Sequence, residues 1–302
     1  MTTLPVGILP PLVTTFRKGR FDPKAYASNL RFLDGTDLAG YVVLGSNGES
    51  VYLSDDEALE VIETAAAARD PKRVIIAGTG RESTQATIDF TRRAAKAGAQ
   101  AALVVPPAYY RSSMTDSALE FHYRSVADAV DIPILLYHVP KFCPVTFSPN
   151  LVLGLASHPN IAGMKDTSGD LVFLTTCLAE RPERFRVYAG TASALLAGLV
   201  LGADGGILAL ANVAPQECVR LLRLVESGDI EGARRLQYRL LPVNQAVTAR
   251  FGVAGLKQAL DHIGLVGGEA RRPLEPLSPR ELEELHAILE TGAIGPLATV
   301  ES

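Results

Sequence analysis

The stretch NIAGMKDTSGD, residues 160–170, places a lysine directly after an apolar run. We predict a buried strand over Ile161–Lys165, because strands covered on both faces form continuous apolar runs, and a helix that begins at Asp170. Burying a hydrated ammonium group is unfavourable, so a lysine at a strand end either reaches solvent or uses its amine in chemistry. The local pattern leaves both interpretations open, and a solvated lysine is the more common case.

The same succession of strand and helix recurs through the first three quarters of the chain. Short β-branched runs are each followed by a longer segment of helical periodicity. Strands are predicted at Gly7–Leu12, Gly40–Leu44, Val74–Gly78, Ala101–Val105, Ile134–Tyr137, Ile161–Lys165, Arg186–Gly190 and Gly205–Leu208. Helices are predicted at Tyr26–Asp37, Ser54–Ala68, Ser83–Ala97, Asp116–Ala129, Ser148–Ser157, Asp170–Ala179, Ala192–Leu201 and Pro215–Ser227. The SDDE segment at Ser54–Glu57 has the form of a capping box, in which side chains satisfy free N–H groups at a helix start.

This alternation predicts an α/β protein with a (β/α)8 TIM barrel. A doubly wound open sheet is the structural alternative, but it normally carries a glycine-rich nucleotide loop, and neither GxGxxG nor GxxxxGK[ST] occurs. Further helices are expected near Ile230–Val247, Val253–Ile263 and Pro279–Glu290. We therefore predict a catalytic barrel over residues 1–228, a C-terminal three-helix extension over 229–292 that packs on the barrel, and a flexible tail over 293–302.

The composition excludes several classes of protein. With 302 residues, 47% of them hydrophobic, the chain can bury a large core, and its net charge of -4 argues against a nucleic-acid-binding surface. Three widely separated cysteines suggest neither disulfides nor a zinc site. The N-terminus lacks the basic region of a secretory signal, and the most apolar later stretch, 193–213, is interrupted by Asp204. We expect a soluble, cytoplasmic protein with no membrane or nucleic-acid partner.

The residues just past each predicted strand point to a site centred on a lysine. In barrels of this kind chemistry occurs at the carboxyl ends of the strands. Hydroxyl groups, tyrosines and small residues gather there together with Lys165, whereas the five histidines are scattered, so we expect no metal and no cofactor. Burial lowers the pKa of an amine, and a neutral amine can attack a ketone to form a Schiff base. The resulting iminium ion acidifies the neighbouring carbon.

Such a reaction needs a proton carrier and a binding site for a carboxylate. Tyr137 ends the strand before that of Lys165, so the two side chains can face each other. The GSNG segment, residues 45–48, offers N–H groups and polar side chains for a carboxylate. A phosphate site at GTAS, residues 190–193, and GADGG, residues 202–206, is an alternative use of these loops, although glycine there is explained more simply by turns and close packing.

Other polar residues near these strand ends have simpler explanations. Tyr109 and Tyr110 are more often packing or interface aromatics. His138 should point away from Tyr137 if the strand continues, which favours a structural role. We expect Glu49 to form hydrogen bonds at a helix entry and not to carry protons.

The motifs together resemble the dihydrodipicolinate synthase/N-acetylneuraminate lyase family of Schiff-base aldolases. GSNGE at 45–49, PPAYY at 106–110, YHVP at 137–140 and GMKDTSGD at 163–170 stand in that family's order and spacing. The resemblance covers almost the whole chain. It implies a (β/α)8 barrel, a homotetramer built as a dimer of dimers, and pyruvate or another 2-oxo acid as substrate.

The resemblance also implies a role for individual residues. Lys165 would form the Schiff base and Tyr137 would transfer protons. Ser46 and Asn47 would bind the oxo-acid carboxylate, with Ser46 also serving as the hydroxyl of a proton relay. Tyr110 would complete the relay of a neighbouring subunit.

Within the family, the chain looks closest to the 4-hydroxy-2-oxoglutarate aldolases. GYVVLGSNGE, ESTQAT at 82–87 and GILALANV at 206–213 carry this likeness, which would place Thr167, Gly190 and Ile207 at the substrate. The lysine-pathway synthases typically carry an arginine shortly after the YNVP motif, whereas this chain has Lys141 and Phe142. We therefore expect cleavage of 4-hydroxy-2-oxoglutarate to pyruvate and glyoxylate.

Other activities remain open. The same chemistry supports the alternative 4-hydroxy-tetrahydrodipicolinate synthase reaction, in which pyruvate condenses with aspartate semialdehyde. It also supports a related sugar-acid dehydratase or deaminase. A non-enzymatic 2-oxo-acid-binding protein is a further alternative, and the intact lysine and tyrosines argue against it.

Overall fold

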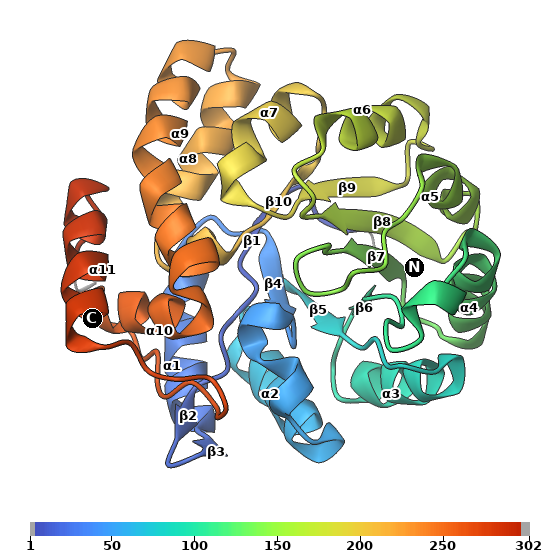
Figure 1. Ribbon diagram of the computed structural model, residues 1–302, viewed down its shortest axis with the longest axis horizontal. Coiled ribbons are helices and arrows are strands. Elements are labelled where there is room, and N and C mark those ends of the chain that lie inside the picture. The colour runs from blue at the N-terminus through green and yellow to red at the C-terminus, as the bar shows by residue number, and fades with distance from the viewer. Residues whose placement is uncertain (1–3, 297–302) are drawn as a thin grey trace.

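Eight parallel strands form one sheet that curls into a barrel in the computed structural model, which describes residues 4–296 (Figure 1). The strands are β1 (Gly7–Leu9), β4 (Gly40–Val43), β5 (Val74–Gly78), β6 (Ala101–Val104), β7 (Ile134–His138), β8 (Ile161–Asp166), β9 (Arg186–Ala189) and β10 (Gly205–Ile207). Their order around the sheet is β1-β10-β9-β8-β7-β6-β5-β4. The seam between β1 and β4 is closed by hydrogen bonds from Leu12 N to Val42 O and from Val42 N to Pro10 O, at 2.8 and 3.0 Å. The predicted (β/α)8 barrel is confirmed.

A helix follows each barrel strand and covers the outside of the sheet (Figure 1). These helices are α1 (Pro23–Asp34), α2 (Asp55–Ala68), α3 (Thr84–Lys96), α4 (Asp116–Ala129), α5 (Pro149–Ala156), α6 (Leu171–Glu180), α7 (Leu195–Val200) and α8 (Pro215–Glu226). The capping box predicted at the start of α2 is present, because Ser54 accepts from Glu57 N and Glu57 accepts from Ser54 N. Most strand residues are buried on both faces, as their apolar runs indicated.

Three details of the first barrel unit differ from the prediction. Helix α1 begins and ends three residues earlier than the predicted range Tyr26–Asp37. Strand β1 ends at Leu9 and not at Leu12, since Pro10 and Pro11 have no N–H group to continue the ladder. A small antiparallel hairpin, β2 (Phe16–Arg17) and β3 (Arg20–Phe21), precedes α1 and was not anticipated.

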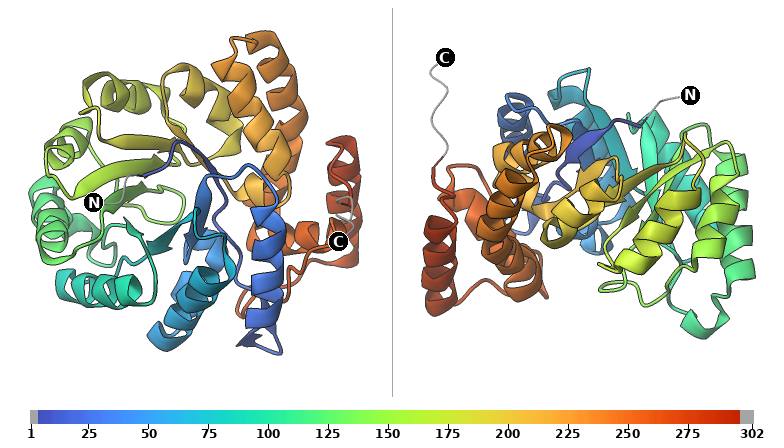
Figure 2. Two further views of the ribbon diagram at one scale, coloured as in Figure 1. Left: turned by 180° about the vertical axis from the view of Figure 1, so that it is seen from behind. Right: turned by 90° about the horizontal axis from the view of Figure 1, so that it is seen from above.

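The C-terminal helices lie together on one side of the barrel, beside α1 and α8 (Figures 1 and 2). They are α9 (Ile230–Gln245), α10 (Gly252–His262) and α11 (Pro279–Thr291), and a π-helical turn, Ala246–Arg250, joins the first two. Ile294 is buried, and its N–H donates to Leu289 O. The rest of the predicted tail includes residues 297–302, which lie outside the described part of the chain.

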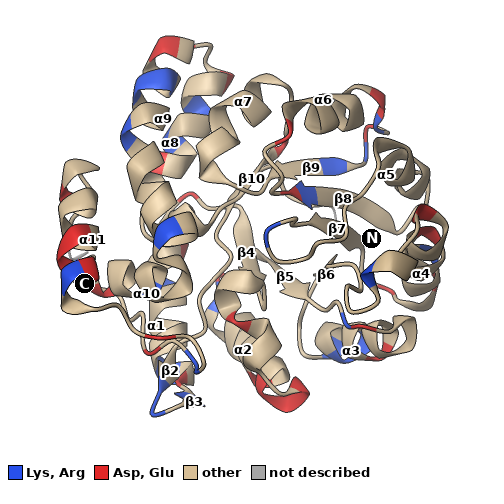
Figure 3. Ribbon diagram, in the orientation of Figure 1, with Lys and Arg blue, Asp and Glu red and all other residues tan. Residues whose placement is uncertain are grey.

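Charged residues of both signs lie mainly on the outer helices and the connecting loops (Figure 3). Few lie along the strands. A lysine at the end of β8 is therefore an exception to the general distribution, and the site is built around it. Between residues 4 and 296, no helix has the length and hydrophobicity needed to cross a membrane.

Candidate active site

Lys165 and Tyr137 face each other at the carboxyl ends of two neighbouring strands. The parallel pairing of β7 with β8 sets the two residues in register. Lys165 is 3% exposed, its Nζ lies 3.4 Å from the Tyr137 hydroxyl group, and it lies 4.4 Å from the centroid of the Tyr137 ring. The predicted juxtaposition is present. Lys165 does not reach bulk solvent, which removes the more common interpretation of a strand-end lysine.

Ser46 joins this pair from the loop after β4. Its hydroxyl oxygen lies 3.2 Å from the Tyr137 hydroxyl oxygen, so an unbroken line of polar contacts runs from Lys165 through Tyr137 to Ser46. Ser46 and Asn47 both lie in the short 3-10 turn Ser46–Gly48 and both line the cavity that contains Lys165. These hydroxyl groups can pass a proton away from the amine.

Thr167 and Gly190 line the same cavity on the side of β8 and β9. The Thr167 hydroxyl group donates to His138 O at 2.8 Å. Gly190 allows the end of β9 to approach β8 closely, because a Cβ there would lie 2.2 Å from a Thr167 methyl carbon and 2.7 Å from Asp166 O. The two residues therefore shape one wall of the cavity.

Two of the predicted site residues are not brought to Lys165 within one chain. Tyr110 is 72% exposed and packs edge-to-face against Tyr109, with ring centroids 5.1 Å apart. Ile207 is completely buried at the end of β10 and is not among the residues that line the cavity. The geometry thus offers Ile207 no direct contact with a substrate, whereas Tyr110 is placed to reach outward.

His138 and Asp166 form a buried pair on the opposite face of the same two strands. Their side chains meet at 2.8 Å, from Nδ1 to Oδ1, and the His138 ring packs against Phe147 and Phe173. Asp166 also accepts hydrogen bonds from the N–H and hydroxyl groups of Ser168. This pair ties the strand ends that carry Tyr137 and Lys165, in agreement with a structural role for His138.

The cavity at Lys165 has a volume of about 330 Å³ and adjoins a further cavity that shares Ser46, Tyr137 and Lys141 with it. Among the described residues that line the cavity at Lys165, only Lys141 and Lys165 are charged, and no carboxylate is present. Lys141 donates to Thr248 O, at 2.8 Å, in the π-helical turn. A negative group of a ligand can therefore pair with Lys141 while a ketone lies at the Lys165 amine.

Other kinds of reactive group are poorly placed. Cys143 lies beside the mouth of the barrel, but burial raises the pKa of its thiol, which stays protonated at neutral pH. Within the described range 4–296, no group of three or more His, Cys, Asp or Glu side chains is arranged to hold a metal ion. The geometry therefore directs attention to the Lys165 amine as the nucleophile.

One buried residue near the site was not recognised in the sequence. Lys257 of α10 is 1% exposed and lies 2.6 Å from the Glu49 carboxylate, at the end of the turn that carries Ser46 and Asn47. A sequence signal existed, because Lys257 falls on the apolar stripe formed by Val253, Leu256 and Leu260. Glu49 does form hydrogen bonds, as expected.

Fold and site together define a (β/α)8 barrel with a buried lysine amine in a cavity at the carboxyl ends of its strands. A family model described as the dihydrodipicolinate synthetase family matches residues 4–292. The chain belongs to this family. It is therefore a class I lyase, a carbon–carbon aldolase that forms a lysine Schiff base with pyruvate.

Individual relatives resemble this chain over nearly their whole length. A 4-hydroxy-tetrahydrodipicolinate synthase of an Exiguobacterium species is 35% identical over 285 residues, which are 94% of this chain and 97% of the relative. The dihydrodipicolinate synthase structure from Thermotoga maritima has a TM-score of 0.92 at 28% identity, covering 96% of this chain and 99% of its own. The synthase from Acinetobacter baumannii, complexed with pyruvate, has a TM-score of 0.91 at 30% identity, covering 97% and 100%.

These comparisons confirm the expected family and leave the expected subgroup without support. The relatives are named as synthases and not as 4-hydroxy-2-oxoglutarate aldolases. The short motifs that resembled the aldolases, such as ESTQAT, are therefore insufficient to choose the second substrate.

Proposed function

We propose that Lys165 is the lysine that forms the Schiff base with pyruvate. Its neutral amine attacks the ketone carbon, and loss of one water molecule leaves an iminium ion. The observation that carries this proposal is the line of contacts from Lys165 through Tyr137 to Ser46. Further support comes from the partner of the amine, which is the Tyr137 hydroxyl group and not a carboxylate that would hold the amine in an ion pair.

The neighbouring groups complete the reaction. The iminium ion draws electrons from the adjacent methyl carbon, which loses a proton to give an enamine. Tyr137 takes part in this proton transfer, and Ser46 relays the proton onward. Ser46 and Asn47 bind the pyruvate carboxylate. The enamine carbon attacks an aldehyde, and hydrolysis of the new iminium releases the product and restores the amine.

We further propose that the aldehyde is aspartate semialdehyde, so that the chain acts as a 4-hydroxy-tetrahydrodipicolinate synthase. Support comes from the names of relatives that match 94 and 95% of the chain at 35 and 34% identity. The cavity supports a second substrate with a carboxylate of its own, because Lys141 provides a cation in the cavity that also contains the Lys165 amine.

Cleavage of 4-hydroxy-2-oxoglutarate is the second candidate, and one observation favours it. Phe142 occupies the region where the synthases typically carry an arginine, and its side chain is 60% exposed at the cavity. Lys141 replaces a forked guanidinium by a single ammonium group, which binds a carboxylate with less geometric control. The two products of this cleavage, pyruvate and glyoxylate, each keep one of the two carboxylates of the substrate.

Steady-state assays with both substrate sets separate the two candidates. The synthase proposal predicts condensation of pyruvate with aspartate semialdehyde at a kcat/KM at least tenfold above that for cleavage of 4-hydroxy-2-oxoglutarate, a difference of about 1.4 kcal/mol in activation free energy. A kcat/KM for cleavage that exceeds the kcat/KM for condensation would favour the aldolase proposal over the synthase proposal. Lys165→Ala is the control for both assays, since each route needs the amine.

Tyr110 leads to a proposal about assembly. We propose that copies associate, as a dimer of dimers, so that Tyr110 of one copy completes the proton relay of its neighbour. The supporting observation is a group of exposed apolar side chains near the mouth of the barrel. It consists of Val51, Tyr109, Tyr110 and Phe142, which are 85, 81, 72 and 60% exposed.

A further inference from the structure

The loop that supplies Ser46 and Asn47 has a strained backbone at both ends. Leu44 before it has a φ of 57° and Glu49 after it has a φ of 54°. Side chains with a Cβ atom rarely adopt this left-handed conformation, and it persists only where surrounding contacts fix the backbone. The position of the Ser46 hydroxyl group therefore depends on whatever holds this loop.

Glu49 makes the strongest of these contacts. The residue is 2% exposed, one of its carboxylate oxygens lies 2.6 Å from Lys257 Nζ, and the other accepts the Arg271 N–H at 2.7 Å. Thr14 adds a hydrogen bond to Gly48 O at 2.6 Å. Glu49 N in turn donates to Ser46 O at 3.2 Å, so the held residue is bonded directly to the backbone of Ser46.

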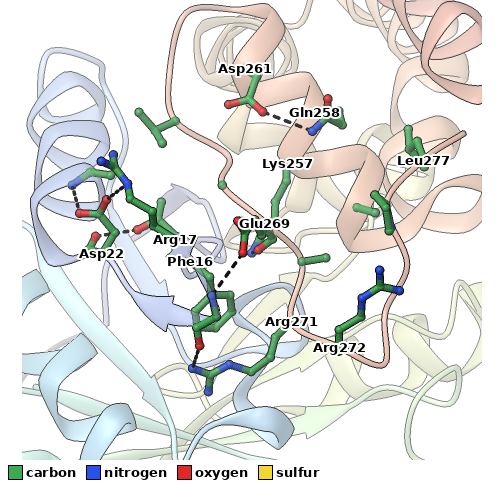
Figure 4. Close-up of a pocket in the computed structure, with 18 residues that line it drawn as sticks. Phe16, Arg17, Asp22, Lys257, Gln258, Asp261, Glu269, Arg271, Arg272 and Leu277 are labelled. Atoms are coloured by element: carbon green, nitrogen blue, oxygen red, sulfur yellow. Dashed lines mark hydrogen bonds and ion pairs between the residues drawn. The ribbon is translucent and has the colours of Figure 1, made fainter. Parts of the chain in front are cut away.

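The partners of Glu49 come from the C-terminal part of the chain and are themselves fixed. Figure 4 shows Lys257 and Arg271 beside Phe16 in the wall of a cavity of about 720 Å³. Lys257 Nζ and the Arg271 guanidinium carbon lie 4.5 and 4.2 Å from the centroid of the Phe16 ring. The Arg271 guanidinium group also pairs with both carboxylate oxygens of Glu57, at 2.7 and 2.8 Å.

This second cavity has no lining residue in common with the cavity at Lys165. A further cavity, which Ser46 and Glu49 help to line, shares Ala254 with the second cavity. Lys257 and Arg271 do not line the cavity at Lys165, and Glu49 is the residue through which both contact the loop of Ser46.

We propose that Glu49 is a positioning residue for Ser46 and that the C-terminal extension acts on the proton relay through the buried Glu49–Lys257 pair. The carboxylate holds the left-handed end of the loop, and the loop holds the Ser46 hydroxyl group within reach of Tyr137. The inference rests on the pyruvate step of the proposed function and is independent of the second substrate.

Exchange of the pyruvate methyl protons in D2O tests this proposal, because enamine formation needs no second substrate. Proton NMR follows the exchange for Ser46→Ala, for Glu49→Gln and for the variant with both changes. Glu49→Gln keeps the shape of the side chain and removes its charge. We expect each single change to slow exchange by about tenfold or more, in line with the loss of a group in a proton relay. The double variant should be no slower than Ser46→Ala.

A merely structural role is distinguished by a second pair of variants. Lys257→Met leaves the Glu49 charge buried without its partner, whereas Glu49→Gln combined with Lys257→Met removes both charges and should regain stability against urea. If the pair served stability alone, exchange would recover together with stability. We expect exchange to stay slow. Asp204→Asn is the matched control, because Asp204 is a buried carboxylate paired with Arg186, at 2.8 Å, at the other end of the barrel.

The outcomes are distinct. Equal slowing by Glu49→Gln in the wild-type and Ser46→Ala backgrounds would overturn the positioning role, as would recovery of exchange in the double-charge variant. Slowing of exchange by Asp204→Asn to the same extent would also overturn it. A folded wild-type chain that exchanges no methyl protons would overturn the pyruvate step, and with it this inference.

Discussion

At the scale of single residues, two buried lysines show how surroundings select the use of an amine. Lys257 and Lys165 are 1 and 3% exposed. Lys257 has a carboxylate 2.6 Å away and donates to Glu269 O, so its amine is committed to an ion pair. The hydrogen-bond partner of Lys165 is a tyrosine hydroxyl group, which leaves the amine available for attack on a carbonyl group.

Lys141 gives a prediction at this scale. Lys141→Met should raise KM for the carboxylate-bearing second substrate by about tenfold or more, because the cavity loses a cation that can pair with the distal carboxylate. Exchange of pyruvate protons should stay unchanged. Lys24→Met, on the exposed face of α1, is the control. An unchanged KM in steady-state assays would place the distal carboxylate elsewhere.

At the scale of the elements, close contact between strands depends on glycine. Gly205 opens β10 with a φ of 144°, and a Cβ there would lie 1.9 Å from Gly7 O in β1. Neither the backbone angle nor the space suits another residue.

Gly205→Ala should therefore destabilise the barrel by about 3 kcal/mol or more. Urea unfolding measures this loss, and a variant that is too unstable to purify would agree with it. Gly154→Ala is the matched control, since Gly154 is exposed in α5 and no atom lies near the position that its Cβ would take. Alanine there should raise the free energy of unfolding by about 0.5–1 kcal/mol. Equal stability of Gly205→Ala and wild type would contradict this account of the seam.

The elements also show which parts of the fold and site a sequence can reveal. Strands such as β8 were predicted because burial on both faces leaves a continuous apolar run, and Tyr137 and Lys165 followed from their places at two strand ends. Strand β1 was predicted too long because the prediction followed the hydrophobic run through Leu12. The lack of N–H groups at Pro10 and Pro11 ends the strand at Leu9. The Glu49–Lys257 pair could not be predicted, since it joins segments far apart in the chain.

At the scale of the whole molecule, the proposed relay needs two copies of the chain. Tyr110 points outward and does not line the cavity that contains Lys165 of the same chain. If Tyr110 acts in a neighbour, a site combines Lys165 of one copy with Tyr110 of another.

Mixing two inactive variants tests this arrangement. Tyr110→Phe and Lys165→Ala should each turn over poorly, and a mixture allowed to exchange subunits should regain activity, because hybrids contain one site with both native residues. Native mass spectrometry of a mixture in which one variant carries heavy isotopes confirms that the hybrids have formed. Hybrids with no more activity than the separate variants would show that Tyr110 does not act across the interface.

The most direct test of the central claim is reduction with borohydride in the presence of pyruvate, followed by mass spectrometry of the peptides. Reduction converts the iminium ion into a stable secondary amine on the lysine that carried it. We predict a pyruvate-derived adduct on Lys165 and loss of activity in proportion to its formation. Active, folded protein that carries no adduct, or carries it on Lys141 or Lys257 instead, would contradict the account.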